Sequence, residues 1–183
     1  DGKDIYDYNL QGLRKKVGVV LQDVFLFSGS ILDNIRLFDS SISREKVISA
    51  AKYVYAHSFI EKLSNGYDTM ILERGGTLSA GERQLIALAR AVVFDTDILV
   101  LDEATANVDT ETEALIQKAM ERISSEKTMI TIAHRLSTIR NADRIMVIHK
   151  GSLVESGNHE ELLAKGGIYT DLYRLQYELG DTA

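Results

Sequence analysis

Two adjacent acidic residues follow an apolar run that predicts a β-strand. The run is ILVL at 98–101, and Asp102 and Glu103 come directly after it. A carboxylate at the end of such a strand can bind Mg²⁺ held on a triphosphate, because this ion prefers hard oxygen ligands. The next carboxylate can orient or deprotonate a water molecule as a general base. Taken alone the pair is a weak signal, since a solvated acidic turn explains it in most proteins.

A second candidate site lies at a predicted helix start. Ser79-Ala80-Gly81-Glu82 precedes the helical pattern LIALARAVV at 85–93. Ser-x-x-Glu in this place is a capping box, which any helix can use. A helix N-terminus also offers free N–H groups and the positive end of a dipole, and glycine lets a phosphate approach closely. Capping and anion binding share this geometry, so the segment suits both.

Two more polar residues come at the ends of predicted strands. Gln22 ends the apolar run KVGVVLQ at 16–22, and His134 follows MITIA at 129–133. Ligands of open α/β sheets gather outside the carboxyl ends of the strands, so both side chains can face a bound ligand. A plain strand end is the alternative for Gln22, and a lone histidine is usually structural. The position of His134 at the same sheet edge as Asp102 favours a functional role.

The spacing of apolar residues predicts an α/β fold. From residue 97 onward, strand-like runs alternate with helical stretches, which indicates crossovers and a mostly parallel sheet. Residues 30–94 instead show helical spacing without a strong strand. We therefore expect one domain in two parts, an α/β catalytic lobe from 1–29 and 95–183 and an inserted helical subdomain from 30–94.

The C-terminal part contains three local signals. Lys150-Gly151-Ser152 predicts a tight turn between two antiparallel strands, and Asn158 with Glu161 predicts a capped helix. Tyrosines at every fourth position, beside leucines, then predict an amphipathic helix in which the tyrosines pack against the protein. They are Tyr169, Tyr173 and Tyr177.

Composition narrows the class of protein. The 183 residues are 45% hydrophobic and 26% charged, which is usual for a folded globular chain. A net charge of −6 and a pI near 5.2 argue against a nucleic-acid surface, because such domains usually show a basic excess. The absence of cysteine excludes disulfides and thiolate metal sites. No apolar stretch is long enough for a membrane-spanning helix. A start at Asp1 rather than methionine suggests a piece of a longer polypeptide.

Three motifs in fixed order resemble those of an ATP-binding cassette (ABC) ATPase. LSAGERQ at 78–84 resembles the signature motif, LDEATANVD at 101–109 resembles the Walker B strand with the D-loop, and AHR at 133–135 resembles the H-loop. The combination is highly specific, and the resemblance extends over nearly the whole chain. The resemblance implies a P-loop NTPase-like fold with ATP and Mg²⁺ as ligands. The Walker A loop, G-x-x-x-x-G-K-[ST], does not occur in these 183 residues, so the N-terminal strands and the P-loop are expected to be missing.

The resemblance also implies a role for each site residue. Glu103 would be the general base, and His134 would contact the γ-phosphate and steady Glu103 and the water. Asp102 and Gln22 would bind Mg²⁺, with Gln22 as the Q-loop residue that senses the γ-phosphate. The remaining residues would meet nucleotide or the interface in a head-to-tail pair of domains. They are Ser79, Gly81, Glu82 and Asp109.

The signature motif departs from the family pattern L-S-G-G-Q at two positions. Ala80 replaces a glycine, and Glu82 replaces the glutamine. The second change places a negative charge near a site for an anion, so we expect weaker binding of ATP held by the opposite subunit.

The stretch QDVFLFSGSILDNI at 22–35 resembles the exporter form of the Q-loop, with Val24 where proline is common. In exporters this region receives the coupling helices of the transmembrane domain, although Phe25, Leu26 and Phe27 also suit an ordinary core. The resemblance thus implies the ATPase domain of a membrane exporter, peripheral at the cytoplasmic face of the plasma (inner) membrane. As a fragment without Walker A, the chain is expected to be inactive alone.

Two alternatives stay open at this point. The chain would be a catalytically silent module that lends its signature motif to another subunit, or an ABC ATPase of the DNA-repair type. The presence of Glu103 argues against the first, and the short helical insert with its exporter-like Q-loop argues against the second. The resemblance implies that transmembrane helices select the transported substrate.

Overall fold

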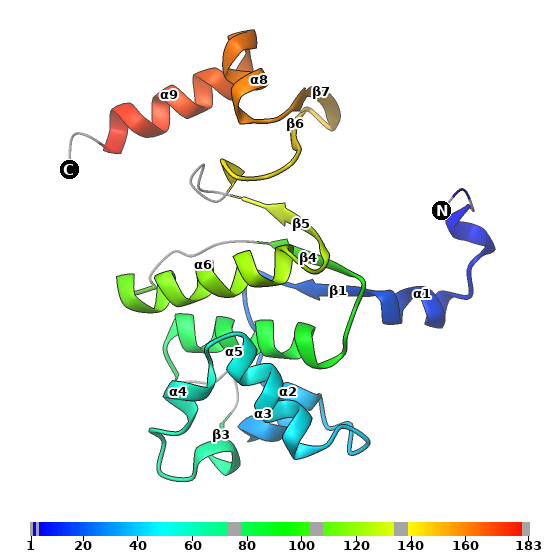
Figure 1. Ribbon diagram of the computed structural model, residues 1–183, viewed down its shortest axis with the longest axis vertical. Coiled ribbons are helices and arrows are strands. Elements are labelled where there is room, and N and C mark those ends of the chain that lie inside the picture. The colour runs from blue at the N-terminus through cyan, green and yellow to red at the C-terminus, as the bar shows by residue number, and fades with distance from the viewer. Residues whose placement is uncertain (1, 3, 73–77, 103–107, 134–138, 181–183) are drawn as a thin grey trace. The chain divides into compact units, whose positions relative to one another are not determined.

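The structure is a computed structural model, and it describes residues 2, 4–72, 78–102, 108–133 and 139–180, the last five without their side chains. The chain divides into two compact units, residues 1–132 and 133–183 (Figure 1). In the described part of the chain, none of the helices combines the length and the apolar character that crossing a bilayer requires.

A parallel sheet forms the centre of the first unit. Its strands are β1 (Val17–Val20), β4 (Ile98–Asp102) and β5 (Thr128–Ile132), in the order β1-β4-β5. Val20 pairs with Leu101, which in turn pairs with Thr131 on β5. The predicted α/β fold with a parallel sheet is therefore confirmed. The predicted end of the first strand at Gln22 is wrong, because β1 ends at Val20.

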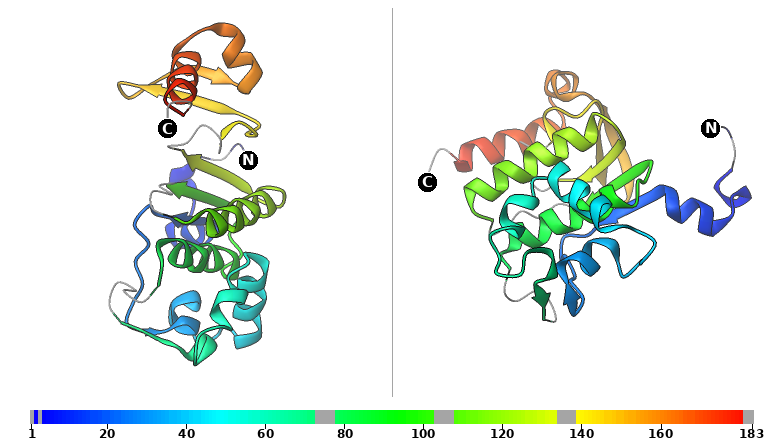
Figure 2. Two further views of the ribbon diagram at one scale, coloured as in Figure 1. Left: turned by 90° about the vertical axis from the view of Figure 1, so that its left-hand side faces the viewer. Right: turned by 60° about the horizontal axis from the view of Figure 1, so that its bottom comes forward.

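One face of this sheet is covered by two helices, α5 (Ala80–Val93) and α6 (Thr110–Ser124) (Figure 2). Both helices are amphipathic, and their apolar stripes cover the alternate strand residues that point to this face. Leu99 and Leu101 are buried there in the main hydrophobic core. The opposite face is different, because its apolar side chains are about half exposed. They are Val19, Ile130 and Ile132.

Short elements occupy most of the chain outside this layer. The 3₁₀ helix η1 (Ile5–Asp7) and helix α1 (Leu10–Lys16) precede β1. Between β1 and α5 lie β2 (Gly29–Ser30), α2 (Ile31–Arg36), α3 (Arg44–Tyr53), α4 (His57–Ile60), η2 (Gly66–Asp68) and β3 (Met70–Ile71).

Serine caps define the starts of two of these helices. Ser30 Oγ accepts the N–H of Asp33 at the start of α2, and Ser43 Oγ accepts that of Lys46 at the start of α3. Such bonds satisfy backbone donors that have no partner inside the helix. Helices α2 and α3 both pack on α5, so the core is continuous from this segment to the sheet. The division into lobes at residues 29 and 94 stays a prediction.

The second unit is a hairpin followed by two helices. Strands β6 (Ile145–His149) and β7 (Ser152–Gly157) are antiparallel, and Lys150 and Gly151 both have positive φ in the turn between them. That geometry suits a two-residue hairpin loop, so the predicted tight turn is confirmed. The remaining elements are α8 (His159–Lys165) and α9 (Ile168–Gly180).

Helix α8 begins with the predicted cap, because Asn158 and Glu161 accept each other's backbone N–H groups. On α9, Tyr169 is buried against Ile145 and Leu162, as expected for a packing face. The side chain of Tyr177 lies outside the described part of the structure.

Candidate functional site

The carboxyl edge of the parallel sheet brings together two of the predicted site residues. Asp102 is the last residue of β4 and is partly buried, whereas Gln22 follows β1 by two residues and is exposed. Since β1 and β4 are paired neighbours in parallel orientation, both residues lie at the same edge. A carboxylate and an amide oxygen are donors that suit Mg²⁺ on a triphosphate.

Protein ligands alone do not form a metal centre within the described ranges, where no three histidine or acidic side chains converge. An ion at Asp102 and Gln22 would therefore need further oxygen ligands, which phosphates and water can supply. The predicted catalytic residues, Glu103 and His134, lie outside the described residues, and their roles stay predictions.

The predicted capping box at the start of α5 is confirmed. Glu82 donates its backbone N–H to Ser79 Oγ at 3.1 Å, and Ser79 donates its own to Glu82 Oε2 at 2.7 Å. Ser79 is exposed and lies at the positive end of a fourteen-residue helix. The Glu82 carboxylate is held beside it and reduces the attraction of this helix end for an anion.

Gly81 has a packing role that its sequence position does not reveal. A Cβ atom built there would lie 2.3 Å from Thr112 Cγ2 and 2.9 Å from Val108 Cγ1, which is closer than atoms can approach. Glycine therefore allows the start of α5 to lie directly against the start of α6. The predicted contact between Gly81 and a γ-phosphate is a separate property and stays a prediction.

Asp109 caps the neighbouring helix. Its carboxylate accepts the N–H of Thr112 at 2.9 Å, and this bond holds the pKa of Asp109 below its ordinary value. The N-termini of α5 and α6 thus lie side by side through Gly81 and Thr112. Figure 1 shows both helices beginning on the side toward which the arrowheads of β1 and β4 point. Two helix dipoles therefore present their positive ends near the carboxyl edge of the sheet.

The segment after Gln22 has alternating burial. Leu26 is completely buried in the core, whereas Phe25 and Phe27 are 52% and 45% exposed. Their rings meet edge to face at 5.0 Å between centroids, and Phe38 meets Phe27 in the same way at 6.1 Å. The sequence left open whether these residues were core or surface. In the structure, Leu26 lies in the core and the two phenylalanines lie at the surface. We refer to residues 25–28 as the aromatic segment.

A groove of about 640 Å³ runs beside this segment. Its apolar walls come from β1, from the aromatic segment and from the end of α5. The wall residues include Val17, Val19, Phe25, Phe27 and Phe94.

Sequence reasoning missed a polar pair, partly buried Arg90 on α5 and buried Asn34 on α2. Arg90 donates to the backbone oxygens of Asn34 and Phe25, both at 2.7 Å, and to Asn34 Oδ1 at 3.0 Å. Burial lowers the pKa of Arg90 to about 10, so the guanidinium is still charged at neutral pH. The partners are 56 and 65 positions apart in the chain, which explains why no local pattern indicated them.

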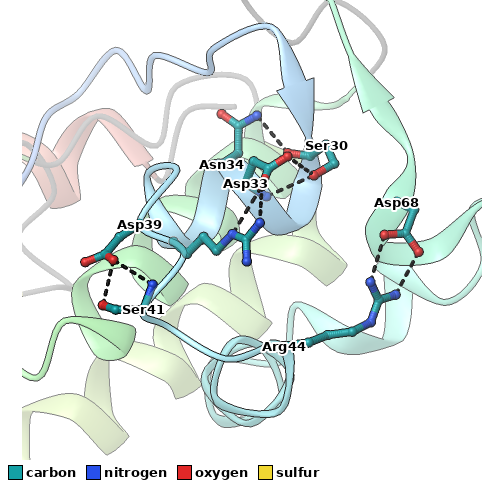
Figure 3. A network of polar contacts seen from close by, with 8 residues as sticks. Ser30, Asp33, Asn34, Asp39, Ser41, Arg44 and Asp68 are labelled. Carbon is teal, nitrogen blue, oxygen red and sulfur yellow. Dashed lines mark hydrogen bonds and ion pairs between the residues drawn. The ribbon is translucent and has the colours of Figure 1, made fainter.

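Other polar bonds fix helices α2 and α3 (Figure 3). The hydroxyl of Ser30 and the guanidinium of Arg36 hold the pKa of Asp33 below its ordinary value. Arg44 on α3 forms a two-pronged ion pair with Asp68, at 2.7 and 2.8 Å between nitrogen and oxygen. This geometry orients α3 against η2 in addition to attracting the charges.

Comparisons with known proteins agree with this arrangement. A family model described as ABC transporter matches residues 1–106. The chain is 53% identical over 176 residues to the probable multidrug resistance ABC transporter ATP-binding/permease protein YheH of Bacillus subtilis, covering 96% of this chain and 26% of that protein. It is 49% identical over 178 residues to the ATP-dependent lipid A-core flippase of Chromohalobacter salexigens, covering 97% of this chain and 31% of that protein.

Among solved structures, a bacterial Atm1-family ABC exporter with ATP bound matches with a TM-score of 0.88 and 42% identity. The match covers 96% of this chain and 31% of the solved one. The chain thus spans between about a quarter and a third of the length of these relatives. It belongs to the ABC transporter family, as a nucleotide-binding domain of the exporter type.

Proposed function

We propose that this chain belongs to the ATP-binding and hydrolysing domain of an ABC exporter, at the cytoplasmic face of the plasma (inner) membrane. The observation that supports it most is the sheet edge, where Asp102 ends β4 and Gln22 follows the paired strand β1. Family membership indicates that the reaction is ATP hydrolysis, since one relative at 49% identity is described as an ATP-dependent flippase.

Each of the predicted site residues would have a different role in ATP hydrolysis. Asp102 and Gln22 would hold Mg²⁺, which when bound neutralises charge on the phosphates. Glu103, next in sequence, would accept a proton from the attacking water, and His134 would orient that water and the γ-phosphate. Phosphoryl transfer depends on such positioning more than on covalent chemistry by the protein.

The start of α5 would complete the ATP site of a second, similar domain. Ser79 is exposed at a helix N-terminus, where N–H groups and the dipole favour a phosphate. Asp109 on the adjacent helix start would lie at the same interface between domains. Two domains paired head to tail would then enclose two ATP molecules, each between the sheet edge of one domain and the α5 start of the other.

The aromatic segment would receive the transmembrane domain. Phe25 and Phe27 expose apolar rings beside a groove of about 640 Å³, and burying such rings against a helix is favourable. Export would follow when ATP-driven pairing of the domains changes the position of this surface.

The 183 residues alone should hydrolyse ATP at a negligible rate. They contain no Walker A sequence, and without that loop no backbone N–H cradle or lysine fixes the phosphates against Glu103. The tests of hydrolysis below therefore use the full-length protein.

The decisive experiment compares Glu103→Gln with Glu111→Gln in the full-length protein in lipid nanodiscs. We expect Glu103→Gln to lower Mg²⁺-dependent ATP hydrolysis at least about 100-fold, because a general base contributes on that scale. Binding of a fluorescent ATP analogue should persist. Glu111 is an exposed residue in the first turn of α6, so its substitution should leave hydrolysis within about twofold.

Equal hydrolysis by the wild type and Glu103→Gln would exclude the proposed role of Glu103. Wild-type protein that binds no nucleotide would exclude the proposed function itself.

A further inference from the structure

Helix α5 connects two regions to which different partners are assigned. Ser79 at its N-terminal cap belongs to the proposed nucleotide interface, and Arg90 lies in its last turns. The two positions are about 16 Å apart along the helix, at 1.5 Å per residue. Helix α5 is almost entirely buried on one side, which makes it a stiff element.

Arg90 binds the aromatic segment directly. One of its terminal nitrogens, Nη1, donates to the backbone oxygen of Phe25 at 2.7 Å. Nε and Nη2 donate to the backbone and side-chain oxygens of Asn34. A planar guanidinium with three directed bonds fixes its partners in orientation as well as in distance.

Asn34 continues the connection. Its Nδ2 donates to the backbone oxygens of Phe27 at 2.9 Å and Ser30 at 3.0 Å, and its Oδ1 accepts the N–H of Phe27 at 2.9 Å. Figure 3 shows this side chain directed toward Ser30. Asn34 is completely buried, so water cannot replace these bonds.

The aromatic segment depends on these bonds for its position. Residues 25–28 belong to no helix or strand, and thus no regular ladder holds their backbone. Leu26 packs into the core beneath them, while Arg90 and Asn34 bind the backbone on both sides of Leu26. Phe25 and Phe27 are therefore held at the surface, beside the end of α5.

We propose that Arg90 and Asn34 are positioning residues that join α5 rigidly to the aromatic segment, so that a displacement of α5 by nucleotide at Ser79 reaches Phe25 and Phe27. This inference rests on the proposed function. It adds a defined route, made of six hydrogen bonds, between the nucleotide interface and the docking surface.

The test follows the aromatic segment with a cysteine at Ser28, which is exposed. This chain has no cysteine of its own, and any others in the full-length protein are replaced. Labelling of Ser28→Cys by a maleimide is timed in nanodiscs, with and without Mg²⁺-ATP and vanadate, beside a measurement of trapped nucleotide. We expect trapping to change the labelling rate at least about threefold in the otherwise wild-type protein.

Arg90→Met keeps an unbranched apolar stem and removes the charge and the donors of the guanidinium. It should abolish the change in labelling rate while at least half of the nucleotide trapping remains. Arg90→Lys keeps the charge and part of the bonding, and should restore part of the change. Arg36→Met is the matched control, because Arg36 pairs with Asp33 of its own helix and should leave the change intact.

A full change in labelling rate in Arg90→Met would overturn the inference, as would an unchanged rate in wild-type protein that traps nucleotide. Wild-type protein that traps none would instead count against the proposed function. If Arg90→Met fails to trap, Asn34→Asp decides. Asn34→Asp keeps the acceptor for Arg90 but loses the donor to Phe27 and Ser30. A normal change in the labelling rate of Asn34→Asp would overturn the inference. Loss of nucleotide trapping in both Arg90→Met and Asn34→Asp would also overturn it.

Discussion

The carboxylate of Glu82 has two opposing effects at one helix start. It accepts the N–H of Ser79 and so stabilises α5, and it places a negative charge where the proposed function requires a phosphate to approach. Glutamine can accept the same bond without the charge. Substitution at this position therefore separates capping from electrostatics.

We predict that Glu82→Gln tightens ATP-driven association of an intact ATPase domain by about 1 kcal/mol or less, the scale of an exposed charge at a helix end. Analytical ultracentrifugation with Mg²⁺-ATP at low ionic strength measures it. Glu82→Ala removes the cap together with the charge, and should lower the thermal stability that Glu82→Gln preserves. Unchanged or weaker association of Glu82→Gln would refute the prediction.

At Asp109, capping can be separated from the effect of charge by changing the pH. Asp109→Ala should lower the free energy of unfolding at pH 7, because the N–H of Thr112 loses its acceptor, whereas Asp109→Asn should cost little. The bond holds the pKa of Asp109 below its ordinary value. Its charge-dependent stabilisation is therefore present above about pH 4 and is lost as the pH falls through the folded value.

Urea unfolding of the chain at pH 7 and pH 3 checks both parts. Asp109→Asn should differ less from the wild type at pH 3 than at pH 7. Wild-type stability in Asp109→Ala at pH 7 would show that the cap contributes nothing.

Among the elements, the contact of α5 with α6 depends on a single missing side chain. Gly81→Ala would place a Cβ against Thr112 and Val108, so the helices must move apart. We predict a loss of about 1–3 kcal/mol in the free energy of unfolding, as for other overpacked sites. Urea denaturation measures it.

Gly12→Ala is the matched control, since a Cβ at that position of α1 meets nothing within 4 Å. It should be neutral or stabilise by up to about 1 kcal/mol, because alanine favours a helix over glycine. Equal free energies of unfolding for Gly81→Ala and Gly12→Ala would mean that α5 and α6 can move apart without loss of stability.

These elements also show what the sequence could predict. The caps at Ser79 and Asn158 and the turn at Lys150-Gly151 depend on residues one to three positions apart, and the amino-acid types indicated them correctly. The strand ending at Asp102 was equally clear. The end of β1 was wrong by two residues, because apolar residues continue past the last ladder bond.

Contacts over long stretches of chain could not be predicted in the same way. The bonds of Arg90 to Asn34 and the packing of Gly81 on Thr112 join residues that are far apart in the chain, so no local pattern links them. Arg90 lay within the apolar run 85–93, where it appeared as an interruption. The alternation of exposed Phe25, buried Leu26 and exposed Phe27 was likewise left open, because three adjacent apolar residues give no period.

At the scale of the whole molecule, the two faces of the sheet differ in what a substitution should cost. Leu99→Ala on the covered face should lower the free energy of unfolding by about 2–5 kcal/mol, as buried leucines do. Ile130→Thr on the other face should change it by about 0.5 kcal/mol or less in the 183-residue chain, since Ile130 is 45% exposed and threonine suits a strand.

Thermal unfolding of both variants, compared with the unsubstituted chain, provides the measurement. A large loss in Ile130→Thr would show that this face is covered in solution, for example by self-association, and the concentration dependence of the unfolding temperature would identify that case.

The length of α5 has a mechanical consequence. Because Arg90 is about 16 Å from Ser79 on one unbroken helix, a tilt of about 5° around the N-terminal end would swing the far end by about 1.4 Å. The hydrogen bond of 2.7 Å from Arg90 to the backbone oxygen of Phe25 would break if it were stretched by that distance, so the backbone at Phe25 must either move with the helix or lose this bond. A small rotation at the Ser79 end is therefore enough to decide whether the bond at the Arg90 end is kept or broken.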